Sequence, residues 1–202
     1  MGHTISASVG DYFAGMTEML QTLDYEAVEE YAEVLYSAWQ ENRCVFLFGN
    51  GGSAFTAGHH ALDYAKTASV DNQRRLKAIS LVDNIGVTTA IGNDISFDET
   101  FVYPLEVHAR PGDVAVAISC SGNSPNAVRG CRWAKEHEMT VVALTGFDGG
   151  VIGRLADLHI NIPSDNYGIV EDLQMTIGHV AAQLLRHRVQ QLAGGELSTL
   201  KQ

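Results

Sequence analysis

The sequence predicts an α/β fold, a three-layer sandwich in which about five parallel strands lie between two layers of helices. From residue 44 onward, short apolar runs alternate with stretches of helical periodicity. The runs are continuously apolar, as is typical of parallel strands that are covered on both faces. Hydrophobic residues make up 46% of the chain and charged residues 18%, which is enough apolar material for a packed core.

The apolar runs define the expected strands at residues 44–48, 76–81, 114–119, 140–145 and 158–162. Helices are expected from Ser53, near residues 84–91, from Ser124, after Gly150, and from about Gly168 to Gln191. In such a sheet, ligands bind outside the carboxyl ends of the strands. The loops directly after the strands are therefore the places where functional residues are expected.

Two amphipathic helices are expected before the first strand. Apolar residues at helical spacing form one stripe in each: Val9, Phe13, Met16 and Leu20, then Val28, Tyr31, Leu35 and Trp39. Asp24 is a plausible N-cap of the second helix. These stripes pack either on a partner subunit or on the chain's own domain. We accordingly divide the chain into a helical extension for oligomerisation (residues 1–42), a main domain (43–192) and a C-terminal tail (193–202).

Length and charge exclude several classes of protein. The chain has 202 residues, which fits one domain, and its 24 acidic and 13 basic residues give a net charge of −11. This charge argues against a nucleic-acid partner, because such binding needs Lys and Arg. No apolar run approaches the roughly 20 residues of a membrane span, and the N-terminus does not resemble a signal peptide. The three scattered cysteines (Cys44, Cys120 and Cys131) fit a reducing cytoplasm.

Two polar loops that follow strands are candidates for phosphate binding. Residues 49–54 read GNGGSA and residues 119–126 read SCSGNSPN, and each sequence turns directly into a helix. Glycines allow backbone N–H groups to approach an anion, and the helix N-terminus adds positive partial charge. Ser119, Ser121 and Ser124 supply further donors. The alternative is a pair of ordinary turns with serine caps. The three hydroxyl groups of the second loop argue against this alternative.

Other phosphate-binding motifs do not occur in this sequence. The nucleotide patterns GxxxxGK[ST] and GxGxxG are absent from their expected positions, which argues against ATPase and dehydrogenase functions. A third glycine cluster, at residues 145–150, is interpreted as a turn.

Acid–base or metal chemistry is indicated by two helices. His59 and Asp63 are four residues apart on one helix, and Glu171 and His179 are eight apart on another, so each pair shares a helix face. Together the four residues are suited to zinc, or to a carboxylate base and a histidine acid. The alternative is a surface His–Asp contact and a core histidine. We assign no ligand role to the other histidines, His60 included, and no nucleophilic role to Cys120.

Four motifs together resemble one family. GNGGSA (49–54), SCSGNSPN (119–126), LTGFDGG (144–150) and DNYGIVED (165–172) are similar to the sugar isomerase (SIS) domain. The helices that carry His59, Asp63 and His179 narrow the resemblance to the phosphoheptose isomerase branch. The resemblance covers residues 7–191.

The resemblance implies a flavodoxin-like SIS fold and a homotetramer with active sites between subunits. It also implies a phosphorylated sugar as the partner, in addition to the absence of nucleic-acid and membrane partners expected from charge and apolar runs. Catalytic residues would be Asp63, His179 and Glu171, and one zinc per site would be held by His59, Asp63, Glu171 and His179. The implied phosphate-binding and substrate-binding residues are Asn50, Gly51, Gly52, Ser53, Asp94, Ser119, Cys120, Ser121, Asn123 and Ser124.

Three positions depart from the family pattern. The family's catalytic glutamate is Asp63 here, its usual glutamine is Glu171, and its arginine shortly after the catalytic acid is missing, with Lys66 the nearest cation. The expected reaction is the conversion of sedoheptulose 7-phosphate to D-glycero-D-manno-heptose 7-phosphate through an enediol. The alternatives are a sugar-phosphate-binding or scaffolding protein of the type that associates with the bacterial replication initiator, and an isomerase of another phosphosugar.

Overall fold

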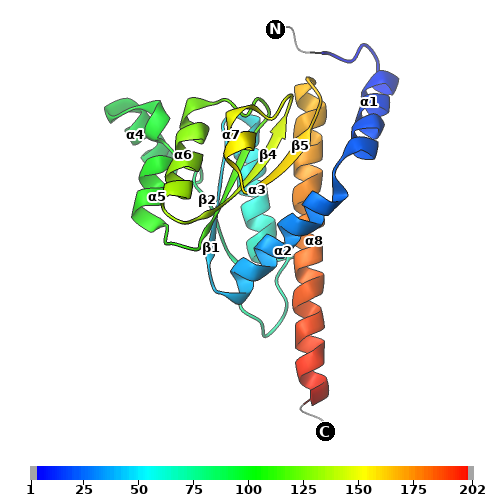
Figure 1. Cartoon of the computed structure of the whole chain (residues 1–202), viewed down its shortest axis with the longest axis vertical. Coiled ribbons are helices and arrows are strands. Elements are labelled where there is room, and N and C mark those ends of the chain that lie inside the picture. Colours follow the sequence, from blue (N-terminus) through cyan, green and yellow to red (C-terminus); the bar gives the residue numbers. More distant parts are fainter. Residues whose placement is uncertain (1–3, 200–202) are drawn as a thin grey trace.

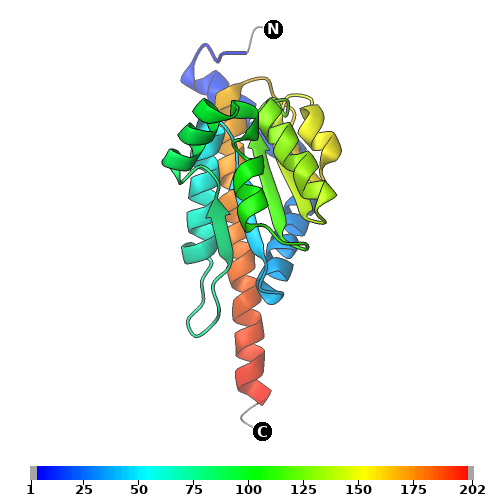
Figure 2. The same cartoon turned by 90° about the vertical axis from the view of Figure 1, so that its left-hand side faces the viewer.

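A computed structural model describes residues 4–199, with side chains described to residue 193. Its centre is one sheet of five parallel strands in the order β2-β1-β3-β4-β5. The strands are β1 (Cys44–Phe48), β2 (Lys77–Ser80), β3 (Val114–Ser119), β4 (Thr140–Gly146) and β5 (Leu158–Ile162). The prediction of a five-stranded parallel sheet between helical layers is confirmed (Figures 1 and 2).

Helices cover both faces of this sheet. On one face lie α2 (Tyr25–Gln40), α3 (Gly52–Leu62) and α8 (Tyr167–Thr199), which pack on Val45 and Leu47 of β1. On the other face lie α5 (Val102–His108), α6 (Pro125–Glu136) and α7 (Gly150–Leu155), which pack on Phe46 and Phe48. Successive side chains of one strand thus enter opposite cores, because side chains alternate along a strand.

The remaining helical segments lie at the N-terminus, after β2 and at the end of α3. They are α1 (Val9–Thr22), α4 (Ile85–Asp94), the 3₁₀ turn η2 (Phe97–Glu99) and the π-helical turn η1 (Asp63–Thr67), which directly continues α3. Helix α5 was not predicted from the sequence, because its seven residues give only a weak periodic signal.

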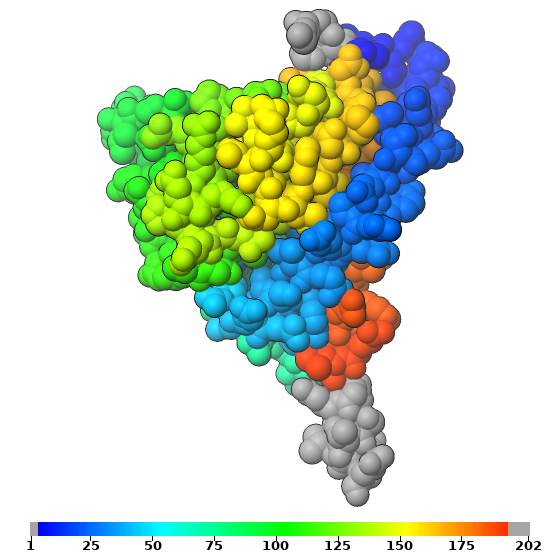
Figure 3. Space-filling model, viewed as in Figure 1, coloured from blue at the N-terminus to red at the C-terminus, as the bar shows by residue number. Residues whose placement is uncertain are grey.

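The two N-terminal helices behave differently. Helix α2 buries Tyr31 and Leu35 completely against its own domain, and Asp24 caps it by accepting from Ala27 N at 3.0 Å. Helix α1 has no buried residue, and its Val9 and Phe13 are 75% and 59% exposed. Figure 3 shows α1 in dark blue at the edge of the molecule. Of the two packing alternatives, α2 takes its own domain. Helix α1 packs Met16 and Leu20 against the same core but leaves Val9 and Phe13 uncovered.

Helix α8 is longer than predicted. Helix α8 spans Tyr167–Thr199, and its C-terminal part extends below the rest of the domain in Figure 1. The helix therefore includes most of residues 193–202, which were expected to be a tail. The last three residues of that segment lie outside the described residues. No helix within the described residues is long and apolar enough to cross a membrane.

Candidate active site

The serine loop (residues 119–124) lies between the end of β3 and the start of α6. Ser119 and Cys120 are buried, whereas Ser121 and Ser124 are partly exposed, so the last two hydroxyls can reach a ligand. Gly122 N donates to both the carbonyl oxygen and the Oγ of Ser119, each at 3.2 Å, which closes the loop into a tight turn. The positive φ of Gly122, +64°, permits this turn.

The strand-one loop (residues 49–52) lies beside the serine loop. A Cβ at Gly49 would lie 2.6 Å from the carbonyl oxygen of Ile118, so only glycine allows this approach of the two strand ends. Asn50 and Asn126 exchange two amide hydrogen bonds of 2.8 and 2.9 Å, which join the strand-one loop to the N-terminus of α6. The sequence analysis did not single out Asn126, although it stands in the SCSGNSPN motif.

Glu171 projects from α8 onto the N-terminus of α3. A Cβ at Gly52 would lie 2.3 Å from Glu171 Oε1, so the carboxylate rests against that glycine. Burial, and then the Glu171 charge, raises the pKa of Cys120 to about 12, while a hydrogen bond with Ser53 acts in the opposite direction. Four predicted site residues (Gly52, Ser53, Cys120 and Glu171) therefore lie together where the two loops meet.

His59, Asp63 and His179 form a compact cluster. His59 Nε2 lies 3.0 Å from His179 Nε2, and Asp63 Oδ2 lies 3.4 Å and 3.5 Å from these two nitrogens. Ligand atoms of a tetrahedral zinc are about 3.3–3.6 Å apart, given bonds of about 2.0–2.2 Å. The cluster therefore fits three ligands of one zinc with a fourth position open. Glu171, the fourth predicted ligand, is not part of it within the described residues.

A π-helical turn sets the position of Asp63. The helix changes from α to π at this residue, and Ala68 N donates to the Asp63 carbonyl five residues earlier, at 2.8 Å. Thr67 Oγ1 donates to Asp63 Oδ1 at 2.7 Å, which leaves Oδ2 toward the two histidines. Such turns occur often at functional sites, because they redirect a side chain without ending the helix.

His60 sets the distance between α3 and α8. Its ring is fully buried, and a Cβ at Gly178 would lie 1.9 Å from its Nε2. Burial lowers the pKa of His60 to about 4, so the ring is neutral at pH 7. The absence of a ligand role was predicted, but the spacing role was missed. Because Gly178 precedes His179, this contact brings His179 within reach of His59.

A cleft of about 760 Å³ runs from the strand-one loop to the His–Asp cluster. Its lining residues are Gly49, Asn50, Gly51, Ala54, Phe55, Gly58, His59, Leu62, Val82, Asp83, Ile85, Thr88, Phe97, Thr100, Phe101 and Met175. The seven steps along helix α3 from Gly52 to His59 rise about 10 Å. The cleft therefore connects the two ends of the site along this helix.

Of two aspartates that follow β2, the predicted site residue Asp94 lies outside the cleft, whereas Asp83, which was not predicted, lines it. Asp94, expected to bind substrate, is exposed at the end of α4, accepts from Asn93 Nδ2 at 2.7 Å, and does not line the cleft. Asp83, which follows β2, does line it, and a Cβ at Gly58 would lie 3.4 Å from its Oδ1. The signal for Asp83 was available, because this residue stands two positions after the second predicted strand, in the loop where ligands are expected.

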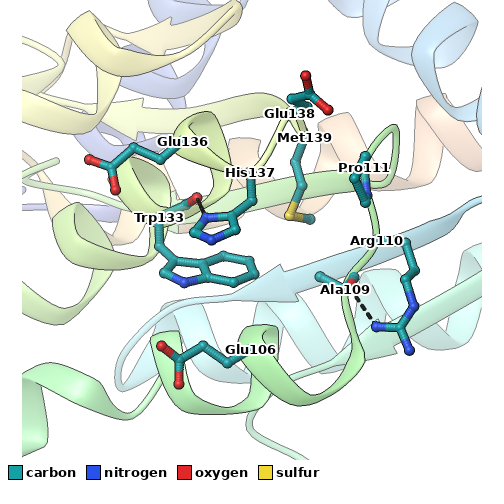
Figure 4. A pocket seen from close by; sticks show the side chains of 9 residues that line it. All are labelled: Glu106, Ala109, Arg110, Pro111, Trp133, Glu136, His137, Glu138 and Met139. Carbon is teal, nitrogen blue, oxygen red and sulfur yellow. Dashed lines mark hydrogen bonds between the residues drawn. The ribbon is translucent and has the colours of Figure 1, made fainter.

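A second cavity, of about 570 Å³, lies at the amino ends of β3 and β4 (Figure 4). The indole of Trp133 and the ring of His137 stack there at 3.8 Å, and Arg110 Nη1 donates to the Ala109 carbonyl. None of the predicted site residues lines it. The candidate active site is therefore the cleft at the carboxyl ends, as expected for a parallel sheet.

Comparison with known proteins agrees with this geometry. The family model of the SIS domain matches residues 11–146. The phosphoheptose isomerase of Bordetella avium is 37% identical over 172 residues, which is 84% of this chain and 86% of that protein. The chain belongs to the phosphoheptose isomerase family of SIS-domain proteins. The resemblance inferred from the four motifs is thereby confirmed.

Other relatives support the same assignment. The phosphoheptose isomerase of Aquifex aeolicus is 34% identical over 164 residues, covering 81% of this chain and 85% of that protein. The solved structure of the phosphoheptose isomerase from Neisseria gonorrhoeae superposes with a TM-score of 0.80 at 30% identity, covering 87% of this chain and 93% of that one. The predicted SIS fold is confirmed, and the matches support an isomerase.

Proposed function

We propose that this protein interconverts sedoheptulose 7-phosphate and D-glycero-D-manno-heptose 7-phosphate through an enediol. The observation that carries the proposal is a cleft that runs along α3 from the strand-one loop to His59 of the His–Asp cluster, about 10 Å apart, with the hydroxyl-rich serine loop beside the strand-one loop. The phosphate binds where the serine loop and the strand-one loop meet, with Ser53, Ser121 and Ser124 as donors. The reacting carbons lie beside Asp63 and His179.

The proposed chemistry is a proton transfer between neighbouring carbons. Asp63 removes a proton from C1 of the ketose, and His179 protonates the carbonyl oxygen at C2, giving an enediol. The proton then returns to C2 while the C1 hydroxyl loses its own, which leaves the aldose with no net change in atoms or electrons. A base and an acid held 3.5 Å apart suit this exchange.

Glu171 lies at the phosphate end of the site. It projects from α8 two turns before His179 and contacts Gly52, so we place it beside the sugar hydroxyl group nearest the phosphate. Asp94 is exposed outside the cleft in the single chain, and a substrate contact would require it to move or to face a partner subunit's site.

In a zinc-bound form, His59, Asp63 and His179 are the proposed ligands, with Glu171 as the fourth residue to test. Atoms that bind zinc cannot also move a proton, so the proton transfers described above refer to the zinc-free site. A bound zinc would polarise the substrate oxygen as a Lewis acid. We further propose a homotetramer, because the apolar residues Val9 and Phe13 on α1 have no cover within the described chain. The free thiols fit a cytoplasmic location.

The test is NMR turnover of sedoheptulose 7-phosphate on protein of measured zinc content. Conversion to the manno-heptose phosphate is expected, together with its loss in Asp63→Ala and His179→Ala. Unchanged turnover in both variants would refute the proposed site. Phosphate-sugar binding without turnover would instead favour the sugar-phosphate-binding or scaffolding alternative, or another phosphosugar.

The residue that removes the proton from C1 of the ketose can be identified by measuring exchange of that proton with deuterated solvent. Asp63→Asn is expected to abolish this exchange, whereas Glu171→Gln is expected to retain it. The opposite result would make Glu171 the base and leave Asp63 as a metal ligand only.

A further inference from the structure

The glycine turn (residues 146–150) supports the serine loop from behind. Gly146 N donates to the Cys120 carbonyl at 2.9 Å, and Ile152 N, in the first turn of α7, donates to the Gly122 carbonyl at 3.0 Å. Val151 N donates to Asn123 Oδ1 at 3.1 Å. Two donors from α7 and one from the turn thus hold the serine loop.

These contacts determine which backbone groups the serine loop can offer to an anion. Asn123 Nδ2 donates to the Ser121 carbonyl at 2.8 Å, so the carbonyls of Cys120, Ser121 and Gly122 each accept a hydrogen bond. A carbonyl that faced a phosphate would repel it. Engaging three successive carbonyls elsewhere keeps this side of the loop suited to an anion.

The two segments are in backbone contact. A Cβ at Gly122 would lie 2.2 Å from the Gly149 carbonyl oxygen, and a Cβ at Gly150 would lie 2.4 Å from the Ser121 carbonyl oxygen. Gly149 and Gly150 have φ values of +82° and +56°, which glycine adopts without strain. Any shift of the turn is therefore transmitted to the serine loop.

The glycine turn packs on the side chain of His159 in β5. A Cβ at Gly149 would lie 2.6 Å from His159 Cε1, and a Cβ at Gly153 would lie 2.5 Å from the same atom. The imidazole therefore packs directly on the backbone at both glycines. Along β5, His159 and Asn161 face α7, whereas Leu158, Ile160 and Ile162 enter the opposite core.

Hydrogen bonds fix the orientation of the His159 ring. Thr145 Oγ1 donates to Asn161 Oδ1 at 2.7 Å, and Asn161 Nδ2 donates to the Phe147 carbonyl at 3.3 Å. The single hydroxyl proton of Thr145 is thus used, so the 2.6 Å contact with His159 Nε2 requires the imidazole to be the donor. Burial lowers the pKa of His159, in keeping with a neutral ring.

We propose that His159, held by Thr145 and Asn161, is a positioning residue for phosphate binding, because it presses the glycine turn against the serine loop. The inference rests on the proposed role of the serine loop as the phosphate site. His159 lies behind the turn and does not line the cleft, so it acts through the backbone and not by contact with the reacting carbons.

The first test measures inorganic phosphate affinity by calorimetry, and KM and kcat for sedoheptulose 7-phosphate. His159→Ala is expected to raise the phosphate Kd and the KM about tenfold, with kcat within about twofold of the parent. His159→Gln, which keeps an N–H donor, is expected to restore most of the affinity. A folded His159→Ala protein with unchanged Kd and KM would overturn the proposal, as would a loss confined to kcat.

A double-mutant cycle with Gly153 tests the contact itself. Gly153→Ala is expected to weaken phosphate binding in the parent, because its methyl group would strike the His159 ring. The same change is expected to have little further effect in the His159→Ala background, since the obstacle is gone. Additive losses in the double variant would refute the coupling.

Ser121→Ala separates this inference from the proposed function. If Ser121→Ala weakens phosphate binding and His159→Ala does not, the positioning role is wrong while the phosphate site stands. If Ser121→Ala has no effect on phosphate binding, the proposed phosphate site is wrong and the inference fails with it.

Discussion

Gly178→Ala is the change to which the His–Asp cluster should be most sensitive. The new Cβ would lie 1.9 Å from His60 Nε2, where about 3.5 Å is the normal contact distance. His60 is fully buried beside Tyr64, with ring centroids 5.7 Å apart, so the ring has little room to move. Helices α3 and α8 must then separate by about 1.5 Å.

This separation should reach the catalytic atoms directly. His59 directly precedes His60, and His179 directly follows Gly178, so the 3.0 Å spacing of the two histidines widens with the helices. A misplacement of about 1 Å costs about a hundredfold in rate. Overpacking alone costs about 1–3 kcal/mol in the free energy of unfolding. We expect kcat/KM to fall about a hundredfold while the protein stays folded.

The assay is kcat/KM for the proposed isomerisation, with zinc affinity and Tm measured on the same protein. Gly10→Ala in α1 is the matched control, because its nearest contact, with Ser8 Oγ, would be an ordinary 3.7 Å. The double variant Gly178→Ala/His60→Ala should recover part of the zinc affinity, since the smaller side chain makes room. A Gly178→Ala protein with kcat/KM within threefold of the parent would refute the spacing argument.

Three further outcomes follow from the charges and burial of the site. Glu171→Gln removes a negative charge near the serine loop, so it should lower the KM for a phosphosugar by a few fold. It should also speed alkylation of Cys120, because the Glu171 charge contributes to the raised pKa of that thiol. An unchanged alkylation rate would contradict this. In the parent at pH 8, iodoacetamide should modify half-buried Cys44 before buried Cys120 and Cys131, and mass spectrometry of the labelled peptides would detect any other order. Burial raises the pKa of Tyr64 well above its ordinary value. The protonated Tyr64 therefore contributes stability below about pH 10, and this contribution is lost as pH rises further. Tyr64→Phe should make the alkaline fall in Tm less steep.

Local patterns in the sequence were sufficient for much of the fold. The apolar runs at 44–48 and 114–119 coincide with β1 and β3, because a strand that is buried on both faces is almost continuously apolar. The run at 158–162 also coincides with β5, where apolar residues alternate with His159 and Asn161. The rule that ligands bind beyond the carboxyl ends of the strands placed the two polar loops in one site. The i, i+4 spacing placed His59 and Asp63 on one helix face, although the π-helical turn that orients Asp63 has no signature in that spacing.

Contacts between residues distant in sequence were decided only by the tertiary structure. Helical periodicity could place Glu171 and His179 on α8, but not determine that His179 meets His59 while Glu171 rests on Gly52. That outcome depends on the close approach of α3 and α8, which the packing of His60 against Gly178 sets.

The same distinction applies to the glycine turn, which the sequence alone indicated only as a turn. Its role became visible once β4 and β5 were paired, because the pairing of Thr145 with Asn161 brings His159 beneath the turn. The sequence by itself determined the strands, most of the helices and the chemistry available in each loop. The tertiary structure decided which of these groups meet, because such meetings depend on packing distances between elements, which no local pattern encodes.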